Sequence, residues 1–369
     1  MSVLGRWTLG AAVLLSLGVL ASGDPGPAGG SIEQFAKLEM ARAAHTTTAL
    51  PSGQLLVAGG LGAGESGLST AELIDVPAAT VRSVTSMAQA RAGHTATPLP
   101  DGRVMLAGGY NGEYLSSVEV FDPALKRFAA MGRLIEGRSG HTATPLPDGR
   151  VLIVGGVGAG WSFLSSAELF DPVTGLSRPA GSLRVPRESH TATPLTDGRV
   201  LVVGGHRGRR EAMEVYASAE LYDPATSRFQ PTGRLGTARH KHDAVRLSDG
   251  WVLVLGGADR TDRRFFATTE VYNPVSESFE PGPTMLGTRY KIQGTTVRLA
   301  SGDVLVSCGA RAAELLDRGS FTFRPVAGRF PSAFYFATAT PLPTGEVVIV
   351  GGYGPDGRNT GEVWRYRAR

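Results

Sequence analysis

The sequence contains a single cysteine, Cys308, among 369 residues, so no disulfide can form within the chain. A chain without disulfides must be stabilised by the packing of its secondary structure. Aromatic residues are also few, at 7%, and charged residues make up 19%, ordinary values for a soluble protein. The net charge of +4 is too small to favour nucleic acid as a partner.

Only one apolar run suggests export or membrane chemistry, and it extends from Leu9 to Leu20. It follows Arg6 and precedes Ala21-Ser22-Gly23, a pattern typical of a secretory signal peptide over residues 1–23. The run is short for a membrane span, and no cysteine follows it to anchor a lipoprotein. We therefore expect an exported protein, periplasmic, surface-bound or secreted, with a Pro/Gly linker at 24–30 and no membrane span in the mature chain. An uncleaved signal anchor is the alternative.

Several motifs of catalytic and ligand-binding sites are missing. The chain has no Gly-rich phosphate loop, calcium loop, His-Glu-x-x-His helix or nucleophile elbow. Its double glycines end apolar runs without a following helix, which argues against a nucleotide site. The sequence therefore predicts no cofactor, no metal ligand and no catalytic residue.

Glycine, by contrast, is abundant at 50 residues, and it marks an internal repeat. The clearest copy, Gly140–Gly156, predicts two short strands joined by a tight turn at Asp148-Gly149. Its second strand, Val151–Val154, is apolar throughout and ends in a double glycine, which indicates a strand covered on both faces. Near copies occupy residues 94–109 and 190–205, and looser copies occupy 45–60 and 242–257.

Two further strands complete each repeat. Ser165–Phe170, followed by Asp171-Pro172, predicts a third strand with a glutamate two residues before an aromatic. Arg127–Met131 and Arg228–Pro231 predict a fourth strand with an aromatic in the middle. Four antiparallel strands in roughly 50 residues are typical of one blade of a β-propeller.

This set of features resembles the kelch repeat over nearly all of the chain after its first 30 residues. The shared features are the double glycine after an apolar strand, the Glu-Leu-Phe-Asp-Pro-like third strand and the aromatic fourth strand. The fourth-strand aromatic is phenylalanine where the family usually has tryptophan, which suggests the bacterial exported type. These phenylalanines are Phe128, Phe229, Phe279 and Phe323.

Seven repeats can be counted from their double-glycine sites. These sites begin at Gly59, Gly108, Gly155, Gly204, Gly256, Cys308 and Gly351. Cys308 is expected to be a small buried replacement for glycine, with a reactive thiol as the alternative. The seventh repeat stops before a fourth strand, and Ile32–Met40 resembles the missing one. We therefore expect an all-β, seven-bladed propeller over residues 31–369, its last blade closed by the N-terminal strand.

Histidine and glutamate recur once per repeat. The histidines are His45, His94, His141, His190 and His242, and the glutamates are Glu72, Glu119, Glu168, Glu220, Glu270, Glu314 and Glu362. A seven-fold ring would spread such residues around the axis and could not gather them on one ion. We expect each histidine to bond a neighbouring blade's backbone or glutamate, and each glutamate to pair with repeated arginines, histidines or backbone N–H groups.

Cations also recur, three residues before each histidine position. They are Arg42, Arg91, Arg138, Arg187, Arg239 and, in unit six, Lys291. In unit seven the same position is Phe334, which is uncharged. If the first strand of each blade is innermost, as the resemblance implies, six cations would ring one mouth of the central channel and attract an anionic group. The alternative is that each arginine pairs with a repeat glutamate or a carbonyl.

The loops after the double glycines vary most between repeats, and propellers usually carry function in such loops. Arginines and aromatics stand side by side there, as on many binding surfaces. The candidate residues are Tyr110, Trp161, Arg207, Arg209, Arg210, Arg263, Arg264, Phe265 and Tyr353. We expect them to share a face with the predicted cation ring.

The leading functional hypothesis is a non-enzymatic scaffold that binds a protein or anionic glycan through this face. The resemblance implies two enzymatic alternatives. Galactose-oxidase-like copper enzymes need a cysteine crosslinked to tyrosine, together with tyrosine and histidine copper ligands. Sialic acid mutarotases need an acid/base group and arginine for a carboxylated sugar, and Glu211 beside Arg210 is the carboxylate to test for this activity.

Overall fold

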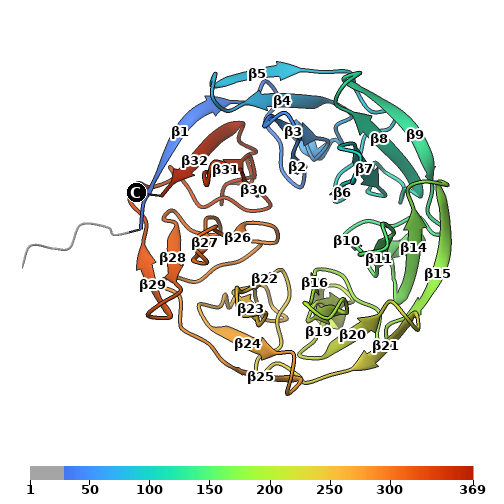
Figure 1. Cartoon of the computed structure of the whole chain (residues 1–369), viewed down its shortest axis with the longest axis vertical. Helices are drawn as coiled ribbons and strands as arrows, with labels where there is room; N and C mark the ends of the chain where they lie inside the picture. The colour runs from blue at the N-terminus through green and yellow to red at the C-terminus, as the bar shows by residue number, and fades with distance from the viewer. Residues whose placement is uncertain (1–28, 369) are drawn as a thin grey trace, which may run out of the picture.

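The computed structural model describes residues 29–368 and contains seven four-stranded antiparallel sheets arranged around a central channel (Figure 1). The predicted signal peptide at 1–23 and linker residues 24–28 lie outside the described residues. In each sheet the first strand lies nearest the channel and the fourth strand forms the rim (Figure 1). The predicted seven-bladed propeller is therefore confirmed.

The strands follow the repeats in order. Blade 1 contains β2 (Thr46–Ala49), β3 (Leu55–Ala58), β4 (Ala71–Asp75) and β5 (Thr80–Ser83). Blade 2 contains β6 (Thr95–Pro98), β7 (Val104–Ala107), β8 (Ser117–Asp122) and β9 (Arg127–Arg133). Blade 3 contains β10 (Thr142–Pro145), β11 (Val151–Val154), β14 (Ser166–Asp171) and β15 (Leu176–Ser182). Blade 4 contains β16 (Thr191–Pro194), β17 (Val200–Val203), β20 (Ala219–Asp223) and β21 (Arg228–Pro231).

The remaining blades repeat this pattern. Blade 5 contains β22 (Asp243–Arg246), β23 (Val252–Leu255), β24 (Thr269–Asn273) and β25 (Ser278–Pro281). Blade 6 contains β26 (Thr296–Arg298), β27 (Val304–Val306), β28 (Glu314–Asp317) and β29 (Thr322–Pro325). Blade 7 contains β30 (Thr338–Pro341), β31 (Val347–Val350), β32 (Glu362–Arg367) and β1 (Ser31–Lys37).

The loops between second and third strands carry the small additional elements. Two loops form hairpins, β12 (Val157–Gly158) with β13 (Ser162–Phe163) and β18 (His206–Arg207) with β19 (Glu214–Val215). The short 3-10 helices are η1 (Ala63–Glu65), η2 (Ala159–Trp161) and η3 (Arg210–Ala212).

The hydrophobic core lies between neighbouring blades. Every residue of β11 is buried, and Leu152 and Val154 share a cluster with Val200 and Tyr222 of the next blade. A strand packed on both faces has no polar face, which explains why the repeat's second strand lacks polar alternation. The predicted continuous apolar strands thus supply the contacts that stack blade on blade.

The ring is closed by β1, which pairs antiparallel with β32 from Ser31 opposite Arg367 to Lys37 opposite Glu362. The strand ends at Lys37, three residues before the predicted end at Met40. A loop contact also crosses the seam between blades 7 and 1, where the Asn359 side-chain amide donates to the carbonyls of Leu61 and Gly62 at 2.8 and 2.9 Å. Further hydrogen bonds between the first and last blades, such as that from the Ala44 N–H to the Phe336 carbonyl, hold the same seam.

Deletion of residues 29–37 is expected to destabilise the protein and to make it aggregate. The deletion exposes the edge of β32 and removes Ile32, which is buried in the core of blades 6 and 7. An uncovered strand edge is a template for pairing with other chains. Thermal melting with light scattering measures both effects. A melting temperature equal to that of the intact chain, without scattering, would contradict closure by β1.

Candidate binding site at the channel mouth

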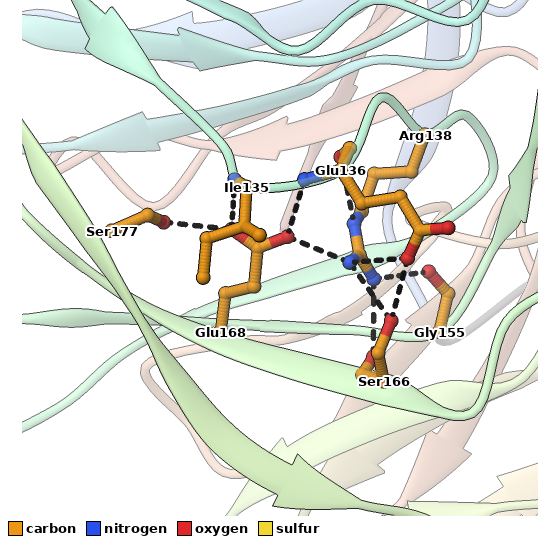
Figure 2. A network of polar contacts seen from close by, with 7 residues as sticks. All are labelled: Ile135, Glu136, Arg138, Gly155, Ser166, Glu168 and Ser177. Atoms are coloured by element: carbon orange, nitrogen blue, oxygen red, sulfur yellow. Dashed lines mark hydrogen bonds and ion pairs between the residues drawn. The ribbon is translucent and has the colours of Figure 1, made fainter.

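A buried ion-pair network fixes the segment that enters the blade in six of the seven blades, and Figure 2 shows it in blade 3. In blade 3, Arg138 donates to the carbonyls of Gly155 and Ser166 at 2.9 and 3.1 Å and to the carboxylate of Glu168 at 2.7 Å. Glu168 also accepts the backbone N–H groups of Ile135 and Glu136 at 2.7 and 3.1 Å. This pairing follows because a buried charge requires a partner and further hydrogen bonds.

Five other blades contain the same pair at the equivalent positions. The pairs are Arg42–Glu72, Arg91–Glu119, Arg187–Glu220, Arg239–Glu270 and Arg289–Glu314, with N···O distances of 2.5–3.0 Å. All six arginines are essentially inaccessible to solvent. The predicted cation ring at the channel mouth is therefore wrong for Arg42, Arg91, Arg138, Arg187 and Arg239, and the alternative of glutamate and carbonyl pairing is what the structure contains.

Units six and seven depart from this arrangement. In unit six the equivalent residue is Arg289 instead of Lys291, because two additional residues before β26 shifted the alignment with the other repeats. In unit seven Phe334 fills the arginine position and lies 5.3 Å from Phe330, whose ring is 5.1 Å from that of Trp364. Blade 7 thus replaces the ion pair with an aromatic cluster.

The repeated histidines connect neighbouring blades. Nε2 of His94 lies 3.0 Å from Oγ1 of Thr46 in the preceding blade. The other contacts are His45–Thr338, His141–Thr95, His190–Thr142 and His242–Thr191, at 3.0–3.2 Å. Burial lowers the pKa of His45, His141 and His190 to about 3, helped by the nearby arginines, and the histidines are therefore neutral at pH 7. The predicted contact with a neighbouring blade is present, although the histidine's partner is a threonine side chain and not the backbone or a glutamate.

Cys308 occupies the position of the first glycine of the pair. Its carbonyl accepts a hydrogen bond from Arg289 at 2.8 Å, as the glycine carbonyls do in other blades. The thiol is buried, and burial raises its pKa to about 12. Such a thiol is a packing residue with little nucleophilic character.

The channel mouth is built by the two residues that separate each arginine from its histidine. The second of the two has a positive φ of 50–63° in all seven blades. Its backbone N–H donates to the same position in the preceding blade in six of the seven steps, at 2.9–3.1 Å. The residues forming this backbone ring are Ala44, Gly93, Gly140, Ser189, Lys241, Lys291 and Phe336. Glycine suits such a conformation, so the bulky residues in blades 5–7 are retained at a cost in strain.

The variable loops lie beside this backbone ring, as predicted. The residue after the double glycine forms a β-bridge with the first of the two mouth residues, as in Ala92–Tyr110 and Glu188–His206. Together the loops and the ring enclose a cavity of about 650 Å³. This volume falls within the range of small-molecule sites.

One wall of the cavity is aromatic. Tyr110 and Tyr114 lie 5.0 Å apart between ring centroids, and Trp161 lies 6.1 and 5.7 Å from them. The guanidinium of Arg209 stacks on the ring of Trp161 at 3.5 Å from its centroid. The Tyr114 hydroxyl is buried without a hydrogen-bond partner among residues 29–368. Burial raises the pKa of Tyr114 to about 12, so its hydroxyl is a donor available to a ligand.

Charged side chains also line the cavity. The carboxylate of Glu188 lies 3.7 Å from Nε2 of His206, and burial raises the pKa of Glu188. The side chain of Glu188 lies over Gly140, where an added Cβ would approach its Oε1 to 2.7 Å. Lys241 donates to Asp262 at 2.7 Å, and Asp262 also contacts His240 at 2.9 Å.

Lys291 lies beside the cavity among aromatic rings. Its ammonium is 5.0–5.9 Å from the ring centroids of Tyr290, Tyr335, Phe336 and Tyr353, and it donates to the Tyr353 hydroxyl. The predicted aromatic Phe265 stacks on Tyr290 at 4.5 Å. This group extends the aromatic surface around the mouth through blades 5 to 7.

The structure brings some of the predicted binding residues together and separates others. Tyr110, Trp161, Arg209 and Arg210 line the cavity, and Tyr353 lines a neighbouring hollow. Arg207 instead pairs with Glu214 on the exposed hairpin. Arg263 and Arg264 are exposed on the loop of blade 5, with Arg264 5.9 Å from the ring of Phe266. Glu211 is exposed on η3 and is not a lining residue.

Sequence reasoning missed Tyr114, Glu188, His206, Lys241 and Asp262. A signal for two of them was present at the mouth positions. These residues are Ala43-Ala44, Ala92-Gly93 and Ser139-Gly140 in units one to three, but Glu188-Ser189, His240-Lys241, Tyr290-Lys291 and Tyr335-Phe336 in units four to seven. Bulky residues inside an otherwise uniform repeat indicate selection for something other than the fold.

Among residues 29–368, no group of three or more His, Cys, Asp or Glu side chains is placed to hold a metal ion. None of the helices in the same range is long and apolar enough to cross a membrane.

A comparison with protein families matches the kelch motif to residues 91–129. The matched residues begin at the buried Arg91 and end within β9, so they span one blade. No curated protein matches the chain. The same buried arginine, double glycine, third-strand glutamate and fourth-strand phenylalanine recur around the ring. The chain is a seven-bladed kelch-repeat β-propeller.

Proposed function

We propose that this propeller is an exported, non-enzymatic binding scaffold of the bacterial type, and that its protein or glycan partner is held at the channel mouth. The observation that carries the proposal is that the repeated and the variable polar residues lie in different environments. The repeated arginines and glutamates are buried in ion pairs. The residues that differ between repeats converge on one cavity, which four of the repeat histidines, His45, His94, His141 and His190, also line. Binding sites on rigid scaffolds are commonly built from such variable positions.

The chemistry of the cavity supports recognition of a polar ligand. The aromatic wall of Tyr110, Tyr114 and Trp161 offers ring faces, and the other lining residues offer charged and hydrogen-bonding groups. The hydroxyl of Tyr114 is buried and has no hydrogen-bond partner among residues 29–368. The free-energy cost of its lost hydration is recovered when a ligand accepts a hydrogen bond from it.

A carbohydrate enzyme is the second candidate, favoured by one observation. Glu188 combines a raised pKa with proximity to His206 in the cavity that Arg209 also lines, as an acid/base group for a carboxylated sugar would require. Nuclear magnetic resonance exchange spectroscopy of a sialic acid tests this candidate, because a mutarotase accelerates exchange between the anomers. A galactose-oxidase-like copper enzyme would need a cysteine crosslinked to a tyrosine at the copper site. Cys308, the chain's one cysteine, is instead buried in the core of blades 6 and 7.

Trp161→Ala is expected to weaken binding of the partner by about tenfold or more, because the aromatic wall loses its largest exposed ring. Binding is measured with residues 24–369 immobilised and probed with glycan and protein arrays. Val173→Ala is the matched control, since Val173 is 94% exposed and lies at the turn between β14 and β15. Partners that bind both variants as they bind the original chain would place the site elsewhere.

A further inference from the structure

A second hollow adjoins the channel cavity at the seam between blades 7 and 1. This hollow has a volume of about 850 Å³ and shares the lining residues Ala44, Leu61 and Phe336 with the cavity. The two adjacent hollows together extend as a groove from the closure seam, across the edge of the channel, to blades 3–5. A groove of this extent exceeds what a single sugar ring or amino acid would fill.

The seam end of the groove is mainly apolar. Met40, Ala43 and Leu61 line it together with Gly62–Gly64 and Phe336. Its polar lining residues are Tyr353, Arg358 and Asn359. The Tyr353 hydroxyl already accepts from Lys291, the Asn359 amide already donates to two carbonyls, and Arg358 is largely exposed. Met40 is 42% exposed, so burial of this end by a ligand would be favourable. Aliphatic walls offer no hydrogen bonds to sugar hydroxyls, and an apolar amino-acid side chain fits them better.

The other end carries an excess of positive charge. Arg209 and Arg210 form no ion pair with a carboxylate among residues 29–368. The cavity is lined by three cations, Arg209, Arg210 and Lys241, and by two carboxylates, Glu188 and Asp262, so one positive charge is left over. Asp262 is already contacted by Lys241 and His240. Arginine guanidinium groups bind carboxylates through two parallel hydrogen bonds, so this end is suited to an acidic side chain.

We infer that the groove binds an extended segment of a partner protein. Its apolar side chain lies at the Leu61 end and its acidic side chain lies at the Arg209–Arg210 end. The inference rests on the proposed binding function and narrows its partner from protein or glycan to an acidic, partly apolar peptide segment. The backbone ring keeps the two ends at a fixed separation, so both side-chain types are required in one ligand.

The test is selection of a random twelve-residue peptide library displayed on phage against the intact propeller. Selected peptides are expected to combine an acidic residue with a large apolar residue. Their affinity should fall about tenfold or more in the double variant Arg209→Glu/Arg210→Glu and in Leu61→Asp, because each removes one end of the groove. Met40→Asp is the second variant for the apolar end, since its exposed side chain tolerates substitution without unfolding.

Arg103→Glu is the control, a charge reversal in the turn between β6 and β7 on the opposite face, and it should leave affinity unchanged. An array of acidic oligosaccharides separates the possible failures. One outcome is that no peptide is selected, while oligosaccharides bind the propeller and fail to bind the double variant Arg209→Glu/Arg210→Glu. This outcome would overturn the peptide inference and leave the binding function standing. Peptides indifferent to Leu61→Asp and Met40→Asp would also overturn it. Ligands indifferent to all of these variants, or no ligand of either class, would overturn both proposals.

Discussion

Acidification from pH 7 to pH 5 is expected to remove most of the propeller's stability. Five buried histidines connect the blades, and burial holds their pKa values far below 6.5, at about 3 for His45, His141 and His190. A group with a lowered pKa stabilises the fold above its unfolded pKa, and this contribution is lost as the pH falls from 6.5 toward 3. Each such histidine costs about 2 kcal/mol at pH 5. Five together rival a typical total stability of about 5–15 kcal/mol.

Two carboxyls with raised pKa values oppose this trend. Asp243 replaces the threonine of other blades and accepts the backbone N–H groups of Thr295 and Thr296 at 3.0 and 2.9 Å. Burial raises its pKa from 3.8 to about 6, and burial also raises the pKa of Glu188. The contribution of Asp243 is therefore present below pH 4 and is lost as the pH rises through 6, the reverse of the histidines. Two carboxyls cannot offset five imidazoles.

Urea unfolding at half-unit steps between pH 4.5 and pH 7.5 measures this dependence. The free energy of unfolding should fall steeply below pH 6.5. His94→Gln should reduce the slope by about 1.4 kcal/mol per pH unit, because one proton fewer is taken up on unfolding. A free energy of unfolding that stays flat between pH 7 and pH 5 would contradict neutral, buried histidines.

Glu168→Ala is expected to cost about 3–5 kcal/mol of stability, because it leaves the Arg138 guanidinium buried without its counter-charge. The same substitution removes the acceptor of two backbone N–H groups, those of Ile135 and Glu136. Both losses fall on the segment that connects blade 2 to blade 3. Urea unfolding at pH 7 measures the change in free energy.

Two variants control for the interpretation. Asp148→Ala removes an exposed ion pair with Arg150 in the same blade and should cost less than about 1 kcal/mol. Glu168→Gln retains an acceptor oxygen and should fall between the two. If Glu168→Ala destabilised no more than Asp148→Ala, the buried network would not hold the blades. Blade 7 indicates that the network is replaceable only as a whole, since Phe334, Phe330 and Trp364 fill its place.

The architecture was predictable from the sequence because each blade carries its own local signals. The turn glycine, the apolar second strand and the double glycine (Cys308-Gly309 in blade 6) mark each four-stranded unit, and they recur about every 50 residues. Closure by β1 followed from a missing strand at one end and an orphan strand at the other. Such arguments depend on local propensity and counting, which a single sequence supplies.

The candidate site was predictable only in part. Tyr110, Trp161 and Arg209 were identified because loop residues that differ between repeats are visible in the sequence. The direction in which the repeat arginines point was not predictable, because a guanidinium before the first strand can turn toward the channel or back to its own blade. Burial decided it, since Arg138 has both a carboxylate and two carbonyls within reach in blade 3. Lys291 was misaligned because the insertion before β26 has no counterpart elsewhere.

A crystal structure of the propeller with a selected peptide tests the central claim most directly, which is that repeated residues build the ring and variable residues at its mouth bind. The account predicts a peptide lying across the channel mouth, in contact with Trp161, Arg209 and Leu61. A peptide bound instead along the fourth strands of the rim, or on the face of the β10–β11 turn, would contradict it.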